Sequence, residues 1–150
     1  MTLARSAAAG ALARSAAAGA AAATAWGLLE PLDRRLLRCD YSDVALLGKA
    51  VTRGRGWRPA GFALHAINGA VFGLAFEAVH RRTGWERRRL ALGLALAEHV
   101  TLWPLCAVVD RRHPARGEEG IPPLLLNGRA FTQATIRHAL FGLLLGRLSR

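Results

Sequence analysis

Sulfur ligands, lysine and acidic residues are scarce in this 150-residue sequence. Its two cysteines, Cys39 and Cys106, lie in no CxxC or Cys/His spacing, so the pattern indicates isolated thiols rather than a zinc or redox site. The span order given below places both cysteines on one side of a membrane, which leaves a disulfide open. Lys49 is the only lysine. The sequence has ten acidic and 21 basic residues, so its formal net charge of +11 comes almost entirely from arginine.

Signatures of membrane enzymes are missing as well. The sequence has no HExxH zinc helix, no paired-aspartate motif of a headgroup transferase, no lipid-phosphatase signature and no serine nucleophile elbow. "LGKAVT" is not a phosphate loop, because Asp43 stands where that loop requires glycine. We therefore expect no cofactor and favour a non-enzymatic protein. No spacing requires a metal either, although acceptable ligand types occur at His65, Glu98, His99 and His138.

Arginine clusters alternate with apolar blocks along the chain. The clusters cover 34–38, 53–58, 81–89 and 111–116. A nucleic-acid-binding protein more often carries its basic residues on one element with interleaved aromatic residues. Basic loops between apolar segments are typical of a multi-pass membrane protein whose loops contact anionic headgroups. We therefore expect a plasma (inner) membrane protein whose partners are membrane lipids, above all anionic ones, and no nucleic acid.

Four segments predict transmembrane helices, at approximately 12–31, 59–79, 90–109 and 126–147. Each approaches the ~20 residues that cross about 30 Å of hydrocarbon, where only a helix satisfies the backbone groups. Pro122 and Pro123 suit the start of the last helix, and Asn127-Gly128 is a candidate interruption. The predicted fold class is all-α. It is one integral membrane domain over residues 1–150, a transmembrane four-helix bundle with a short amphipathic surface helix in the first loop.

That surface helix is predicted in "SDVALLGKAVTR". Ser42 or Asp40 is placed to cap its start. One face of the helix carries Val44, Leu47, Gly48 and Val51. A helix of this kind is expected to lie on the membrane surface.

The N-terminal segment carries an identical repeat, LARSAAAGA, at 3–11 and 12–20. Nine residues make two and a half helical turns, so the second copy points to a different face. A cleaved signal peptide is the alternative to a retained span, because "AAATAW" offers small-residue cleavage sites. The loop "HRRTGWERRR" is short and holds five arginines, so the positive-inside rule favours both termini in the cytoplasm.

Polar residues recur near the centres of three predicted spans. An ionisable side chain at that depth costs about 2.5–3.5 kcal/mol, which pairing offsets. The best pair is Glu98 with Arg137, as opposite charges on consecutive helices, and a structural ion pair that fixes helix register is the alternative to a functional one. We take Glu98, His99, Arg137 and His138 as catalytic candidates. The candidate binding residues are His65, Asn68, Thr101, Gln133 and Arg137.

The second span also carries small residues at four-residue intervals. Gly61, Gly69 and Gly73 share the face of His65. Such small-xxx-small stripes let two helices approach closely. The sequence therefore predicts close packing along this face, and Gly69 and Gly73 are a candidate surface for a homo-oligomer.

The stretch from Tyr41 to Leu148 resembles small uncharacterised multi-pass membrane proteins of high-GC bacteria. The resemblance is carried by "DYSDVALLGK", "LHAINGAVFG", "AEHVTLWPL", "DRRHPAR" and "RAFTQATIRHALFG". It implies the layout of about four spans and brings no assigned activity.

The predicted function is a non-enzymatic integral membrane protein that binds a lipid or a partner. One alternative is an intramembrane enzyme acting on a lipid headgroup or a prenyl-type substrate. Glu98 or a histidine would then be the general base and Arg137 the anion clamp. The other alternative is a small proton-coupled carrier in which Glu98, His99 and His138 relay protons.

Overall fold

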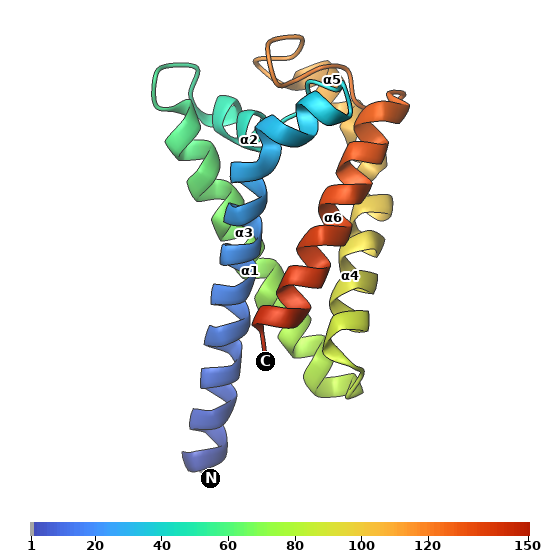
Figure 1. Cartoon of the computed structure of the whole chain (residues 1–150). Helices are drawn as coiled ribbons and strands as arrows, with labels where there is room; N and C mark the ends of the chain where they lie inside the picture. The colour runs from blue at the N-terminus through green and yellow to red at the C-terminus, as the bar shows by residue number, and fades with distance from the viewer. Residues whose placement is uncertain (1) are drawn as a thin grey trace.

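Four long helices form an antiparallel bundle in the computed structural model, which describes the backbone of residues 2–150 and the side chains of residues 5–150 (Figure 1). Within this part of the chain every regular element is helical. The lower end of the bundle holds both chain termini and the turn between α3 and α4, and the upper end holds α2 and α5. The elements are α1 Thr2–Leu36, α2 Asp43–Val51, α3 Trp57–Thr83, α4 Arg87–Leu102, the 3-10 turn η1 Trp103–Leu105, α5 Cys106–Arg112 and α6 Gly128–Leu148.

Side-chain and glycine caps set the helix boundaries. The prediction of a short helix in the first loop is confirmed as α2, where the Ser42 side chain accepts a hydrogen bond from the Ala45 amide. Asn127 caps α6 in the same way, so this helix begins at Gly128 and the preceding prolines lie outside it. α3 ends at Thr83 and is followed by Gly84, whose φ of 65° favours a residue without a Cβ.

The third predicted span, 90–109, is not one continuous helix. α4 ends at Leu102, and the chain passes through η1 before α5 begins. Pro104 lies at this break. Proline has no amide hydrogen and clashes with the preceding turn, so it interrupts an α-helix.

Small residues bring α1 and α3 into close contact. A Cβ added at Gly69 would lie 2.4 Å from the Gly19 carbonyl oxygen, and one at Gly73 would lie 2.0 Å from that of Ser15. The predicted close-packing stripe is therefore present, but α1 of the same chain occupies it. Gly69 and Gly73 are buried and are not a free surface for a second copy, which corrects that part of the oligomer prediction.

A polar contact joins three helices near the lower end. Ser15 donates a hydrogen bond of 2.8 Å to the Glu77 carboxylate, and Arg87 donates one of 2.9 Å to the same oxygen. Because Glu77 is only 2% exposed, these donors compensate a buried charge.

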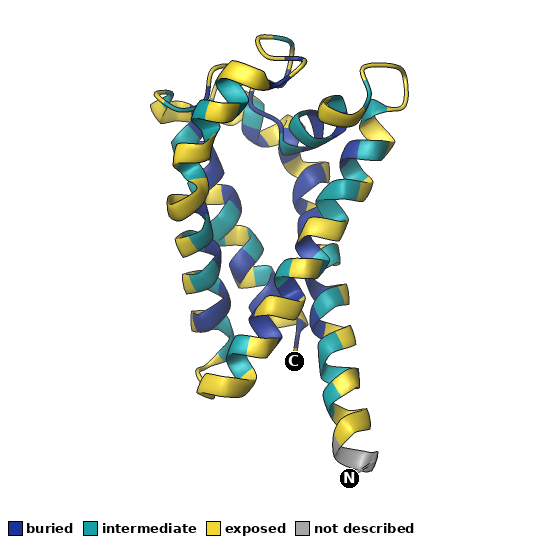
Figure 2. Cartoon of the chain, turned by 180° about the vertical axis from the view of Figure 1, so that it is seen from behind, coloured by how far each residue is buried: buried dark blue, intermediate teal, exposed yellow. Residues whose placement is uncertain are grey.

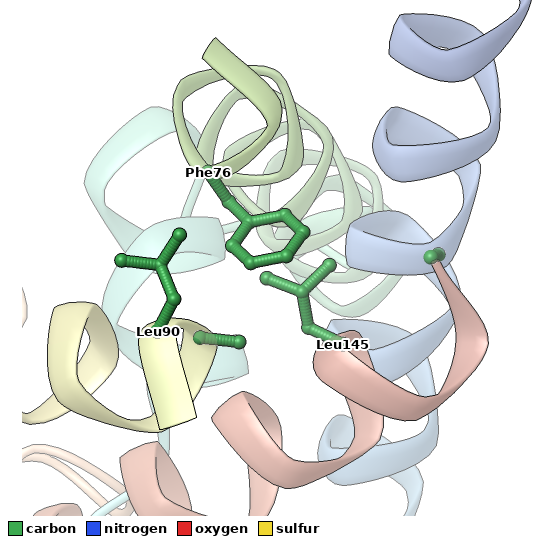
Figure 3. Close-up of a cluster of buried hydrophobic side chains, with 5 residues drawn as sticks. Phe76, Leu90 and Leu145 are labelled. Carbon is green, nitrogen blue, oxygen red and sulfur yellow. The ribbon is translucent and has the colours of Figure 1, made fainter. Parts of the chain in front are cut away.

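An apolar cluster joins all four long helices at the lower end. Phe76 of α3, Leu90 of α4 and Leu145 of α6 converge there, as Figure 3 shows. Ala18 of α1 and Ala91 complete the cluster. Over their whole lengths, α1 packs mainly on α3 and α4 mainly on α6, α1 also contacts α6, and α3 and α4 contact each other little.

Large apolar side chains are exposed on the long helices, among them Leu28 of α1, Ile67 of α3 and Val100 of α4. Figure 2 shows exposed residues on the outward sides of these helices. Two helical segments of the described chain are long and apolar enough to cross a membrane: Trp57–Thr83 and Arg87–Arg112. Only 22% and 11% of the residues in their most apolar 18-residue stretches are buried inside the protein. α1 and α6 do not reach the same hydropathy, so the prediction of four spans is not confirmed. The other two predicted spans, 12–31 and 126–147, are nevertheless largely helical, as α1 and α6.

Candidate functional site

A cavity of about 290 Å³ lies between the four long helices, below α2. His65, one of the α3 residues that line it, is eight residues from the start of that helix, about 12 Å from the upper end. Six of the predicted site residues line this one cavity: His65, Asn68, Glu98, His99, Arg137 and His138. The structure thus brings together most of the residues that the sequence placed at a common depth.

Two predicted binding residues lie elsewhere. Thr101 is exposed on the outer side of α4 and does not line the cavity. Gln133 is fully buried and contributes indirectly, because its side-chain amide donates a 2.9 Å hydrogen bond to Asp33. Gln133 is therefore part of the support for the cavity wall.

Arg137 is buried at the cavity wall and is the centre of an ion-pair network. Its Nε and Nη2 donate to the two oxygens of Asp33 at 2.6 and 2.7 Å, a bidentate geometry. Nη1 donates to Asp43 at 2.8 Å and lies 3.6 Å from Glu30. Nη2 also donates to the Tyr41 carbonyl at 3.0 Å. Both nitrogens at the end of the guanidinium and its Nε are thus engaged by the protein itself.

The predicted pairing of Glu98 with Arg137 is wrong. The carboxylates that contact Arg137 come from α1 and the start of α2. Glu98 instead faces His138, with 4.0 Å between its Oε2 and the histidine Nε2. Depth along the helices placed these residues correctly, but it did not identify which neighbour Arg137 faces.

Local structure near the end of α1 explains this arrangement. Glu30 accepts hydrogen bonds from the Asp43 and Val44 amides at 2.7 and 3.1 Å, so it occupies the N-terminus of α2. Amides at a helix start have no partners within the helix, and a carboxylate there also interacts favourably with the helix dipole. α2 is held from its other side by α3, where Gly48 packs against the Trp57 carbonyl. α2 therefore packs on the bundle through its buried residues, and its predicted apolar face is partly used inside the protein.

Charges in this network favour an ionised Asp43. Burial is the largest single influence and raises the pKa of the Asp43 carboxyl, but the Arg137 guanidinium, His65, the Tyr41 hydroxyl and His138 together outweigh it. The pKa of Asp43 therefore lies below its usual value. Burial and the adjacent Asp43 charge raise the pKa of the Tyr41 phenol, so this group stays a hydrogen-bond donor to Asp43.

Two histidines stack on the opposite wall, with ring centroids 4.8 Å apart. His138 Nδ1 lies 2.8 Å from the Ala134 carbonyl, which can only accept, so Nδ1 carries the hydrogen. His99 Nε2 lies 2.9 Å from the Thr135 hydroxyl, whose own hydrogen is donated to the Phe131 carbonyl. His99 Nε2 is therefore the donor of that pair. These contacts leave the Nε2 lone pair of neutral His138 pointing towards Glu98.

Aromatic rings form much of the remaining wall. Trp26, Phe72, Trp103 and Phe141 line the cavity, and the Phe72 and Phe141 rings meet edge to face at 5.2 Å. Trp26 is only 6% exposed, and its Nε1 has no hydrogen-bond partner among the described residues. The same holds for Nε2 of His65, and buried polar atoms of this kind usually have a partner.

The described residues include no group of three or more His, Cys, Asp or Glu side chains placed to hold a metal ion. Cys39 and Cys106 both lie at the upper end and both are free thiols. The polar and aromatic groups that line the cavity are carboxylates, imidazoles, the Arg137 guanidinium, the Cys106 thiol, the Asn68 amide and aromatic rings. The carboxylates, imidazoles and rings among them exchange hydrogen bonds and protons and attract cations.

Sequence reasoning missed the aromatic wall of the cavity and four residues of the Arg137 network: Glu30, Asp33, Tyr41 and Asp43. A signal for two of them was present, because Glu30 and Asp33 are three residues apart and share a face near the end of the first span. Tyr41 and Asp43 lie in the first loop, and only the packing of α2 brings them into the bundle.

Comparison with protein-family models, with curated proteins and with solved structures finds no match to this chain. Its geometry is therefore the basis for the function proposed next.

Proposed function

We propose that this chain is a multi-pass plasma-membrane protein that binds a small amphiphilic ligand, such as a lipid, in the cavity between its four long helices. The cavity of about 290 Å³ below α2 is the observation that carries this proposal. Its lining joins apolar rings to a few convergent polar groups, the composition typical of ligand pockets. Binding, and not turnover, is the proposed activity.

The distribution of polar and apolar residues supports the membrane setting. Large apolar side chains are exposed along the outside, among them Ile67 and Val71 on α3 and Val100 on α4. The buried residues instead include a full ion-pair network around Arg137. Lipid is as apolar as a protein core, so intramembrane charges face the inside of a bundle. α1 and α6 would cross beside the two more apolar helices, with their charged residues turned inwards.

The enzyme alternative has less support than the binding proposal. It used Arg137 to clamp an anion, but this guanidinium already binds Asp33, Asp43 and the Tyr41 carbonyl. A substrate phosphate would have to displace a buried bidentate carboxylate from it. Breaking a buried ion pair in this way leaves an uncompensated charge and is costly.

The carrier alternative keeps one specific observation in its favour. Glu98, His138 and His99 follow one another along the cavity, with 4.0 Å between Glu98 Oε2 and His138 Nε2 and 4.8 Å between the two rings. Carboxylates and histidines in such a row can pass protons within a membrane. Proton flux into vesicles containing the protein, compared with vesicles containing a Glu98→Gln variant, tests this second candidate.

Native mass spectrometry of the detergent-purified protein tests the binding proposal. Leu102 is exposed at the edge of the cavity and lines it, so Leu102→Trp should obstruct ligand entry. Val100 is exposed on the same helix but does not line the cavity, so Val100→Trp is the matched control. We expect a bound lipid-like molecule on wild type and on the control, and at least a fivefold lower occupancy on Leu102→Trp. Equal occupancy in all three proteins, or none in wild type, contradicts the proposal.

A further inference from the structure

Negative charge exceeds positive charge on the polar side of the cavity. Glu30, Asp33 and Asp43 surround the single guanidinium of Arg137. Because the donors of Arg137 are engaged by these groups, it offers an incoming anion no free hydrogen bond. Asp43 and Glu98 both line the cavity, so the surroundings of a ligand are anionic.

Two hydrogen-bond acceptors face each other on the other side. Glu98 Oε2 lies 4.0 Å from Nε2 of His138. Since the Nδ1 hydrogen of His138 is donated to the Ala134 carbonyl, neutral His138 presents a lone pair at Nε2. A proton on Nε2 would turn this contact into an ion pair. The positive charge of a ligand ammonium group beside the Glu98 carboxylate can take the place of that proton.

Aromatic walls point to the same ligand class. Trp103 and Phe72 line the same cavity as Glu98 and His138. Aromatic faces combined with carboxylates are the environment in which proteins recognise ammonium groups. Trp26 also lines the cavity and is more than nine-tenths buried, and its Nε1–H has no partner among the described residues. The aromatic lining is an observation independent of the acidic groups.

We propose that the cavity binds a lipophilic cation: an apolar molecule that carries an ammonium group, with Glu98 as its counter-ion. The inference rests on the proposed function, because it requires a ligand-binding cavity, and it adds the charge of the ligand. The apolar part of the ligand packs against the rings, and the ammonium group lies on the cavity side of Glu98 and His138. Anionic amphiphiles are disfavoured at the same place.

The test compares two probes that differ in charge alone. Benzyltrimethylammonium carries a positive nitrogen where neopentylbenzene, its neutral isostere, carries a carbon. Binding of radiolabelled benzyltrimethylammonium to the purified full chain is measured by equilibrium dialysis, with neopentylbenzene as competitor. We expect saturable binding of one cation per chain and a neutral competitor at least tenfold weaker. Glu98→Gln should weaken cation binding at least tenfold, whereas Glu119→Gln, which neutralises an exposed carboxylate outside the cavity, should leave it unchanged.

Each failure has its own meaning. If the neutral isostere competes as well as the cation, or if Glu98→Gln binds the cation like wild type, the charge inference is overturned. A lipid-like ligand that is still lost in Leu102→Trp then leaves the proposed cavity function standing. If neither probe binds and Leu102→Trp changes nothing, both proposals fall. The comparison of the two probes on wild type decides the inference even where Glu98→Gln does not fold.

Discussion

Arg137 is the residue on which three segments depend, because α1, α6 and the start of α2 meet at its guanidinium. Removing it leaves the buried carboxylates of Glu30 and Asp33 and the half-buried carboxylate of Asp43 without their cation. We expect Arg137→Ala to lower the free energy of unfolding by about 3–5 kcal/mol, the usual result of breaking a buried ion pair from one side. Unfolding in detergent, followed by circular dichroism, measures the change.

Two control variants sharpen this prediction. Arg129→Ala removes an exposed arginine from the same helix and should change stability by no more than about 0.5 kcal/mol. Glu98→Gln should be equally mild, since Glu98 does not pair with Arg137. The network is assigned incorrectly if Arg137→Ala unfolds like wild type. The same holds if Glu98→Gln is destabilised as much as Arg137→Ala is expected to be.

Asp43 gives the network a dependence on pH. Its pKa is lower in the folded protein than in the unfolded chain, where it is about 3.9, so folding favours the ionised form. The resulting stabilisation is fully present above pH 4 and is lost as pH falls through the folded-state pKa. We expect the melting temperature of wild type to fall more steeply below pH 4 than that of Asp43→Asn. Parallel curves for the two proteins would show that Asp43 is not held ionised by Arg137.

At the residue scale, the sequence predicted the depth of the polar side chains along the bundle better than it predicted which side chains pair. Helical rise alone places His65, Glu98 and Arg137 at comparable levels, and all three line one cavity. The partners of Arg137 could not be derived this way. Asp43 belongs to a loop helix whose place depends on the contact of Gly48 with Trp57, a tertiary contact with no signal in local pattern.

At the scale of elements, helix pairing depends on the absence of side chains at a few positions. A Cβ at Gly69 would meet the α1 backbone at Gly19, whereas a Cβ at Gly93 would meet nothing within 4 Å. We expect Gly69→Ala to destabilise the protein by about 1–3 kcal/mol through forced separation of α1 and α3. Gly93→Ala should stabilise it by up to about 1 kcal/mol, because alanine is the better helix former. Thermal unfolding of the two variants under the same conditions measures both effects, and a stable Gly69→Ala would argue against this α1–α3 contact.

The elements themselves were largely accessible from sequence. The loop helix was predicted from its cap and apolar face, and it occurs as α2. The break at Pro104 was missed because the apolar run continues through it, and hydropathy does not register backbone geometry. The small-residue stripe predicted close packing. Such a stripe does not indicate whether the partner helix belongs to the same chain or to a second copy.

At the scale of the whole molecule, the contacts of α1 bear on whether this helix is retained or is cleaved as a signal peptide. Ser15, Ala18 and Gly19 of the second repeat copy are buried in the bundle, whereas the corresponding Ser6 and Ala9 of the first copy are exposed. Cleavage after the small residues near Thr24 would remove the helix that packs on Gly69 and Gly73. These contacts favour a retained α1 over a cleaved signal peptide.

Orientation in the membrane is the corresponding prediction for the whole molecule. The lower end holds both termini and the α3–α4 turn, which has five arginines in ten residues. Short basic loops stay on the cytoplasmic side, so we expect both termini there. A green fluorescent protein fused after Arg150 should fluoresce, and alkaline phosphatase at the same place should be inactive. Changing Arg87, Arg88 and Arg89 to Gln should increase inverted molecules more than changing Arg111 and Arg112 does. Active phosphatase at the wild-type C-terminus would reverse the orientation, and with it the side of the membrane to which α2 and the roof of the cavity belong.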